Sequence, residues 1–527
     1  PTTGKDPLYA QLFLTRSVLK IDTVFDNALG KYLEKDLLIK DHSLALQAAL
    51  NLTASDLDLI LKDNGLDIAT VKLTLANASM LYRYGLLAKA LKLSIPDLIS
   101  VKALTGLDPF TSLPANGADS NDADVVLNQT LKFAESVAMI KSSGLKIADL
   151  DFLFRHKFDA TGKYRKVQES ALSTIKLLAD GINLIRAEHA LPAPAANPND
   201  LSAFGAFTDD VLQQKLGLAM DADKVQLFLA MWTGTQPKDW NAVKDSMSVF
   251  IQQAQFDLLF VPDAPDADDK TKQQNSLQKR SVLAKALLPF IQGQLISKMI
   301  ADTLASATGA SSDRVNWLTA DAARLHISTQ PGASLMQIFA NAAVASEAAN
   351  LEAAYTLLSK VQQLAQAFTF TDRELQYIFK NIDLNLLPVK EPAALANAQT
   401  LFKSFVRLQA YVSLRNDLAG GNDELITLFE SAKITYDNSI DEATRKQQHL
   451  QALYTQLAAL SRRDVATVQE VAEHLGIAAN SQTVNGQVTV EVAAFADERA
   501  TVSLWNILQQ LQSFGVSLPV LKDAVNV

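Results

Sequence analysis

Residues 351–368, LEAAYTLLSKVQQLAQAF, decide the fold class. Apolar side chains recur in this stretch at every third or fourth position, which places them on one face of a helix with about 3.6 residues per turn. They are Leu351, Tyr355, Leu358, Val361, Ala365 and Phe368. We therefore expect an amphipathic helix that packs through a single face.

The same spacing recurs along the rest of the chain, at 75–91, 125–140, 282–300, 394–414 and 502–514. The one strand-like stretch is 483–490, TVNGQVTV, where Asn-Gly between β-branched residues predicts a hairpin. The sequence thus predicts an all-α fold: a multi-lobed array of packed antiparallel helices with at most one short β-hairpin near 483–490.

A short pattern marks four expected helix starts. Each copy has an apolar residue, a Ser or Thr, two variable positions, an acid and a second apolar residue, at 52–57, 93–98, 370–375 and 460–465. This is the pattern of a capping box with a hydrophobic staple. It predicts that the N-caps are Thr53, Ser94, Thr371 and Ser461. The intervals fit stacked, solenoid-like two-helix units; many helices with ordinary caps are the alternative.

Loop-forming composition suggests where the lobes end. Pro, Gly, Asn and Asp gather at 109–124, three prolines lie in 191–200, and 262–276 is acidic and then polar. We predict an N-terminal helical lobe at 1–190, a Pro-rich linker at 191–204, a central helical lobe at 205–476, a hairpin or loop excursion at 477–491 and a C-terminal helical piece at 492–527.

Composition narrows the possible partners. Of 527 residues, 48 are Lys or Arg and 57 are Asp or Glu, a net charge of −9, which argues against nucleic acid. The chain has no cysteine, so disulfides and thiolate sites are excluded. No apolar run approaches the roughly 18 residues that span a bilayer, so we expect no membrane insertion by this chain. No secretion signal is visible at the start, and we expect the natural protein to extend in either direction.

No catalytic, cofactor-binding or metal-binding residue is predicted. The histidines lack the i, i+3 or i, i+4 spacing that presents two metal ligands on one helical face; they are His42, His156, His189, His326, His449 and His474. Packing or surface roles are expected for them, with a contribution to a pH response as the alternative.

Two acidic runs invite a cation-binding interpretation, one at Asp263, Asp266, Asp268 and Asp269 and the other at Asp119, Asp122 and Asp124. An EF-hand needs Gly at its sixth position and Glu at its twelfth, and neither run provides them. Solvated loops are therefore expected. Nucleotide-binding and hydrolase motifs are also missing from the sequence.

Residues 73–94, LTLANASMLYRYGLLAKALKLS, continue through Asp97 and Leu98 to 104–110, LTGLDPF. This stretch resembles the α-helical shell region of Tc toxin complex A subunits, which are related to the Salmonella virulence plasmid A protein. Two other parts of the chain are similar to the same region. One is the opening, with Tyr9, Leu12 and Phe13 followed by residues 42–50, and the other is the pair of stretches 283–304 and 313–318. Tyr82, Arg83 and Tyr84 stand out within it; we expect a partly exposed helix face, with an Arg83–carboxylate bridge between helices or subunits as the alternative.

The resemblance implies a part in a homopentamer whose helical shell surrounds a translocation channel. In that family a change of pH opens the shell, and a toxic enzyme carried by the B and C subunits passes into the host cell. Host receptors or glycans are contacted by modules that have no counterpart here, and a secreted or bacterial surface location is implied. This chain would be a structural, non-enzymatic shell segment.

Two other interpretations stay open. The first is a free-standing α-helical repeat module that binds another protein. The second is an all-α enzyme such as a lyase, which needs converging carboxylates that the sequence does not suggest.

Overall fold

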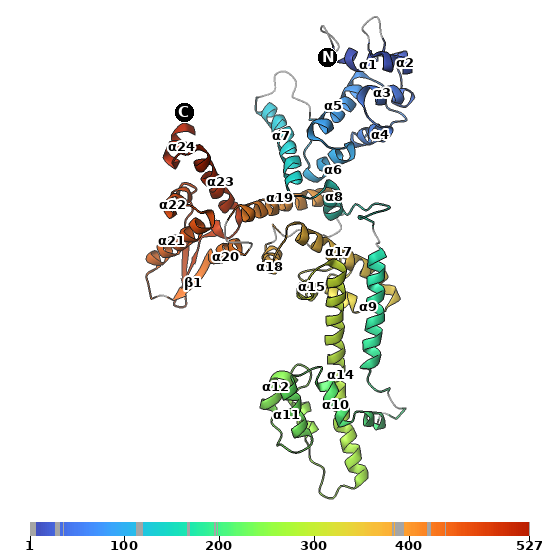
Figure 1. Cartoon of the computed structure of the whole chain (residues 1–527), viewed down its shortest axis with the longest axis vertical. Helices are drawn as coiled ribbons and strands as arrows, with labels where there is room; N and C mark the ends of the chain where they lie inside the picture. Colours follow the sequence, from blue (N-terminus) through green and yellow to red (C-terminus); the bar gives the residue numbers. More distant parts are fainter. Residues whose placement is uncertain are drawn as a thin grey trace. The chain divides into compact units, whose positions relative to one another are not determined.

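The computed structural model describes most of the chain. It covers residues 7–26, 32–34, 36–111, 120–165, 169–193, 196–197, 199–381, 384, 395–418, 423–437 and 439–525, without the side chains of 120–127, 395–396 and 524–525. Helices dominate these residues, and their strands form one small sheet (Figure 1). The predicted all-α class is confirmed.

The chain divides into two compact units. Unit 1 comprises Pro1–Tyr164 and Leu364–Val527, and unit 2 comprises Arg165–Gln363. These units do not follow the lobes suggested by composition, because the Pro-rich stretch at 191–204 lies inside unit 2. Prolines end a helix there, but the helices on both sides of the stretch pack on the same long helix. A break in a helix is therefore not a break between units.

The first part of unit 1 is a group of short helices. They are α1 (Leu8–Phe13), α2 (Arg16–Ile21), η1 (Thr23–Phe25), η2 (Ile39–His42), α3 (Ser43–Leu50), α4 (Ala54–Asp63), α5 (Leu75–Leu91), α6 (Ile95–Thr105), α7 (Ser120–Ser142) and α8 (Ile147–Arg155). Helix α5 contacts α3, α4 and α6, and α6 also contacts α8. The core side chains from these helices include Leu57, Ile60, Leu81, Leu98 and Val101, all almost completely buried.

The second part of unit 1 is built along α19. Its elements are α18 (Asp372–Lys380), α19 (Leu395–Asp417), α20 (Glu424–Ser431), β1 (Lys433–Asp437), α21 (Glu442–Ser461), α22 (Val465–His474), β2 (Asn480–Val484), β3 (Gln487–Glu491), η5 (Ala493–Phe495), α23 (Glu498–Phe514) and α24 (Leu518–Val525). Helix α19 packs on α6, α8 and α23, and so joins the two parts (Figure 1).

The predicted hairpin is present, but it belongs to a larger sheet. Strands β2 and β3 pair antiparallel around Asn485 and Gly486, which both have positive φ as this turn requires. A third strand, β1, pairs with the other edge of β3. The described sheet therefore has one strand more than the predicted hairpin. Strand β1 is only five residues long and mostly exposed, so it carries too little apolar alternation to be recognised.

Unit 2 is organised around the 40-residue helix α14 (Asp269–Thr308). The other elements are α9 (Glu169–Glu188), η3 (Ser202–Ala206), α10 (Asp209–Leu216), α11 (Ala222–Trp232), α12 (Trp240–Met247), α13 (Gln253–Leu259), α15 (Ser312–Thr319), α16 (Leu335–Phe339), η4 (Ala345–Glu347) and α17 (Ala348–Ala367), whose last four residues belong to unit 1. Helices α10–α13 share a hydrophobic core with residues 283–291 of α14, and α9 and α15 also pack along α14 (Figure 1).

The helix starts agree with the capping pattern in three of four places. Thr53 and Thr371 form complete capping boxes, and the Ser94 hydroxyl accepts the Asp97 amide at 3.2 Å. Ser461 was predicted wrongly as a cap. It is the last residue of α21 and donates to the Leu457 carbonyl at 2.6 Å, and Asp464 caps α22 instead.

Two expected loops are shorter than predicted. Helix α7 begins at Ser120 within the segment 109–124, and α14 begins at Asp269 within 262–276. Asp268 caps α14 by accepting the Thr271 amide at 2.7 Å, so an acidic run that looked like a loop is also a helix start.

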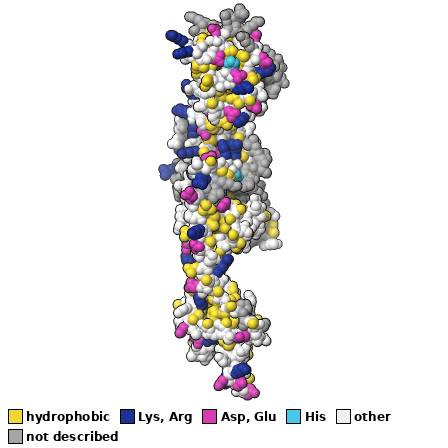
Figure 2. Space-filling model, turned by 90° about the vertical axis from the view of Figure 1, so that its right-hand side faces the viewer, with side chains coloured by type: hydrophobic (Ala, Val, Ile, Leu, Met, Phe, Trp, Pro, Cys, Tyr) yellow, Lys and Arg dark blue, Asp and Glu magenta, His cyan; other side chains and the backbone are white. Residues whose placement is uncertain are grey.

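The surface mixes both signs of charge. On the face drawn in Figure 2, Lys and Arg side chains are interspersed with Asp and Glu, and hydrophobic side chains lie between them. In the part of the chain described, no single helix is long and apolar enough to cross a bilayer; one bent pair, Ile39–Leu50 with Ala54–Asp63, passes by length and composition alone.

Candidate functional site

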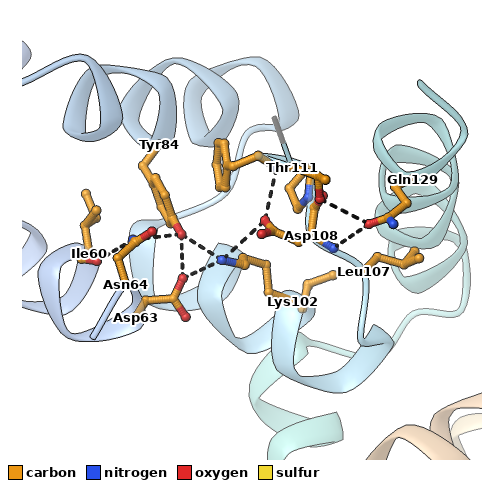
Figure 3. Close-up of polar contacts among 12 residues, drawn as sticks. Ile60, Asp63, Asn64, Tyr84, Lys102, Leu107, Asp108, Thr111 and Gln129 are labelled. Carbon is orange, nitrogen blue, oxygen red and sulfur yellow. Dashed lines mark hydrogen bonds and ion pairs between the residues drawn. The ribbon is translucent and has the colours of Figure 1, made fainter. Parts of the chain in front are cut away.

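A polar cluster at the junction of α4, α5 and α6 includes Tyr84 and Lys102 from the stretch that resembles the toxin family. The Tyr84 hydroxyl of α5 donates to Oδ2 of Asp63, which is the last residue of α4, at 2.5 Å. Lys102 Nζ of α6 lies 2.6 Å from the same carboxylate oxygen and 2.7 Å from the Tyr84 oxygen (Figure 3). Asn64 Nδ2 donates to the Tyr84 oxygen at 3.1 Å. One phenol, one ammonium and one carboxylate thus join three helices.

Two aromatic rings lie beside the Lys102 ammonium. The rings of Tyr84 and Phe110 stack with centroids 3.9 Å apart. Lys102 Nζ lies 5.1 Å from the Tyr84 centroid and 5.4 Å from the Phe110 centroid, within the range of cation–π attraction. The side chain of Lys102 is only 14% exposed, so this attraction is weakly screened by water.

A second layer of contacts extends the cluster to α7. Asp108 Oδ1 lies 3.5 Å from Lys102 Nζ and accepts the Phe110 amide at 3.0 Å. The Asp108 amide donates to Gln129 Oε1 at 3.3 Å (Figure 3). The segment that follows α6 is therefore held between the Lys102 ammonium and a side chain of α7.

The protonation states of Tyr84 and Lys102 fit a structural role. Burial and the hydrogen bond to Asp63 raise the pKa of Tyr84 to about 12. Burial alone would lower the pKa of Lys102, but its bonds to Asp63 and Tyr84 outweigh burial and raise that pKa. A general base or nucleophile needs a pKa near the working pH. Here both groups move away from neutrality, so Tyr84 stays a phenol and Lys102 an ammonium.

The three residues singled out in this helix have different environments. Tyr84 is buried in the cluster, Tyr82 is partly exposed and Arg83 is exposed. The partly exposed face therefore belongs to Tyr82 and Arg83 alone. Sequence reasoning missed Asp63 and Lys102, because the two lie 39 positions apart and neither belongs to a motif.

Buried carboxylates elsewhere in unit 1 have partners of the same kind. On α8, Asp149 Oδ1 accepts from the Tyr164 hydroxyl at 2.8 Å, and Asp151 Oδ2 accepts from the Ser100 hydroxyl at 2.7 Å. Between α19 and α23, Arg407 donates to both oxygens of Glu498, at 2.7 and 3.0 Å. Each buried carboxylate has cationic or hydroxyl partners, as burial of charge requires.

Each histidine has its own local environment. Two are buried: His189 Nδ1 lies 3.1 Å from Lys215 Nζ, and His449 Nδ1 lies 2.8 Å from the Tyr436 oxygen. Burial lowers the pKa of both rings. His42 Nδ1 lies 2.5 Å from Asp22 Oδ2, His326 contacts the Ala322 carbonyl, His156 follows α8 and His474 ends α22.

The acidic runs have local roles where they are described. Asp268 caps α14, and Asp263 accepts from Asn275 at 2.7 Å. Asp119 and the side chains of Asp122 and Asp124 lie outside the described residues. Within the described ranges, no group of three or more His, Asp or Glu side chains is placed to hold a metal ion. The absence of catalytic, cofactor and metal sites stays a prediction.

No protein-family model and no curated protein matches the chain. The family assignment therefore stays a prediction that rests on the resemblance of residues 73–110, the part of the chain that contains Tyr84 and Lys102.

Proposed function

We propose that this chain is a structural shell segment of a Tc-type toxin A subunit. In that role it encases and supports the channel through which a toxic enzyme reaches the host cell. The enzyme, the channel and the receptor-binding modules belong to other parts of the assembly. The proposal rests on the resemblance of residues 73–110 and on the helical fold, with unit 1 and unit 2 as building blocks of the casing.

One observation carries the proposal: polar side chains of the stretch that resembles the toxin family bond within the fold. Tyr84, Lys102 and Asp63 bond one another and tie three helices together. The pKa values of Tyr84 and Lys102 are both raised, away from neutrality, which suits rigidity and not proton transfer. A casing needs such ties, because it must keep its shape while other parts move.

The test is the symmetry of the natural full-length protein that contains this chain. A short epitope inserted between Pro265 and Asp266, in an exposed segment before α14, is labelled with an antibody fragment and imaged by electron microscopy. Five fragments around the outside of a five-fold particle are expected. A monomeric particle with one bound fragment, or fragments inside the particle, would contradict the shell assignment.

The alternative, a free-standing repeat module that binds another protein, gives a different result in the same experiment. Such a module works as a monomer and presents a regular superhelix to its partner. A second epitope, inserted at Gly162 in unit 1, is the control for local disruption, because a Cβ at Gly162 would meet no atom within 4 Å. Both labelled proteins are expected to give the same particle.

A further inference from the structure

Helix α5 has an apolar stripe that lies outside its buried face. Ala78, Leu81, Tyr84 and Ala88 face the core, and α3, α4 and α6 cover that side. Outside that face lie Leu75, Tyr82 and Leu86, separated by seven and four residues. At 3.6 residues per turn these three positions fall within about 40° of one another around the helix axis.

The stripe is accessible to solvent. Leu75 is 41% exposed and Leu86 is 52% exposed, while Tyr82 is partly exposed between them. Ser79 and Ala90 are exposed on the same side and are small, so they leave room for side chains from a facing helix. Seven- and four-residue spacing of apolar side chains is the pattern with which one helix packs into another.

The charges beside the stripe all have one sign. Arg83 borders it on one side and Lys89 on the other, and Lys92 follows the end of the helix. Within the described part of the chain, none of these three forms an ion pair with a carboxylate. The sequence contains no Asp or Glu between Asp67 and Asp97. This side of α5 is therefore apolar and basic, in a chain whose net charge is −9.

We propose that this face of α5 is a docking surface for an amphipathic helix of another protein, one whose apolar stripe is flanked by Asp and Glu. The apolar residues give the contact its area, and Arg83 and Lys89 select the partner by charge. Two copies of α5 are poor partners for each other, because their packing would bring Arg83 and Lys89 of both copies together. Like charges in such a seam oppose pairing.

A pair of designed peptides tests the proposal with the whole 527-residue chain. Each peptide has Leu at alternating third and fourth positions over about 20 residues, enough to match the length of α5. One peptide carries Glu beside the stripe and the other carries Lys at the same positions. Binding is measured by fluorescence anisotropy. The Glu-flanked peptide is expected to bind and the Lys-flanked peptide to bind at least about tenfold more weakly.

Variants of the chain identify the surface. Leu86→Asp is expected to weaken binding of the Glu-flanked peptide by at least about tenfold. Leu258→Asp changes an equally exposed leucine in unit 2, at 55% exposed, and is expected to leave binding unchanged. The double reversal Arg83→Glu with Lys89→Glu should exchange the preference, so that the Lys-flanked peptide binds better. Circular dichroism checks that every variant keeps its helical content.

Three results would overturn the proposal. The first is binding that lacks the expected specificity, either because both peptides bind equally or because Leu86→Asp leaves binding intact. The second is binding to phosphatidylserine vesicles in place of the peptide, lost in Leu86→Asp, since a basic amphipathic helix can also attract an anionic membrane. The third is concentration-dependent self-association that Leu86→Asp abolishes, with no peptide bound, which would make a second copy the occupant.

Discussion

Arg415 and Glu374 form an ion pair inside unit 1 in which both side chains are almost completely buried. Arg415 Nη1 lies 2.9 Å from Glu374 Oε1, and the two side chains are 3% and 0% exposed. Glu374 also accepts from the Tyr411 hydroxyl and the Thr371 amide, each at 2.8 Å, and Arg415 donates to the Phe368 carbonyl at 2.9 Å. The pair thus connects the start of α18 with α19.

Removing one partner should be far more costly than replacing both. Arg415→Ala leaves the Glu374 carboxylate buried without its cation, and we expect a loss of about 3–5 kcal/mol in the free energy of unfolding. The paired replacement Arg415→Met with Glu374→Leu removes both charges and is expected to lose less. Urea unfolding of the whole chain, followed by circular dichroism, measures both.

The control is an exposed ion pair whose arginine lies on α18, next to Glu374. Arg373 contacts Glu430 on the surface of unit 1, and Arg373→Ala is expected to cost about 0–1 kcal/mol. If Arg373→Ala and Arg415→Ala destabilised the chain equally, burial would not be the reason for the effect.

Gly106 should tolerate alanine less well than Gly65, although both have φ of +70°. A Cβ at Gly106 would lie 2.9 Å from Gln399 Cδ of α19, whereas a Cβ at Gly65 would meet no atom within 4 Å. Both substitutions carry the strain of a left-handed backbone, about 1 kcal/mol. Only Gly106→Ala must also displace the side-chain amide of Gln399. We expect a lower melting temperature for Gly106→Ala than for Gly65→Ala; equal melting temperatures would mean that Gln399 moves aside freely.

The helices of this fold could be predicted because their signal is local. The stripe at 351–368 became α17, and 75–91 became α5 at the same residues. Strand β1 could not be predicted, because it becomes a strand only by pairing with β3, more than 50 residues later. The compact units were equally out of reach, since the packing of α19 on α6 joins distant parts of the chain.

The corrected cap at α22 can be tested by comparing Asp464→Ala with Ser461→Ala, with Ser94→Ala as a reference cap on α6. Ser94→Ala removes an observed cap and is expected to destabilise unit 1 by about 1 kcal/mol. Asp464→Ala should also lower the melting temperature, because Asp464 accepts the Thr467 amide at 2.8 Å. Ser461→Ala removes no cap and should have the smallest effect at this helix start. A larger loss for Ser461→Ala than for Asp464→Ala would restore the cap expected from the sequence pattern.

The candidate site was only partly within reach of sequence reasoning. Tyr84 was noticed because it belongs to the stretch that resembles the toxin family. Its partners Asp63 and Lys102 lie on other helices, and an isolated acid or lysine at a helix end has no distinctive pattern. Three-dimensional packing alone brings Lys102 Nζ to 2.7 Å from the Tyr84 oxygen.

Tyr84 should make the chain lose stability at alkaline pH. Its pKa is about 12 in the folded chain and about 10 when unfolded, so the folded form favours the neutral phenol. The stabilisation is fully present below about pH 10 and is lost as the pH rises toward 12. Tyr84→Phe should reduce this alkaline loss, measured as the change in melting temperature between pH 9 and pH 11, about one unit on either side of the unfolded pKa. An unchanged loss would assign the alkaline effect to other tyrosines.

His189 should make unit 2 lose stability in acid. The ring is 2% exposed at the end of α9, and its Nδ1 lies 3.1 Å from Lys215 Nζ of α10. Burial and the Lys215 charge lower the pKa of His189, and Glu188 opposes them only partly. The unfolded chain therefore takes up the proton first as the pH falls below about 6.5, and the stability of the folded form decreases from there downward.

Amide hydrogen exchange locates this effect. Between about pH 7.5 and about pH 5, on either side of the unfolded histidine pKa, protection at the end of α9 and in α10 should fall once the intrinsic pH dependence of exchange is corrected. His189→Gln should remove most of the fall, because its side chain can accept from Lys215 without gaining a charge. His474→Gln, at the exposed end of α22 in unit 1, is the matched control and should leave the fall unchanged. Equal loss of protection in the His189→Gln chain would show that the acid response of unit 2 has another source.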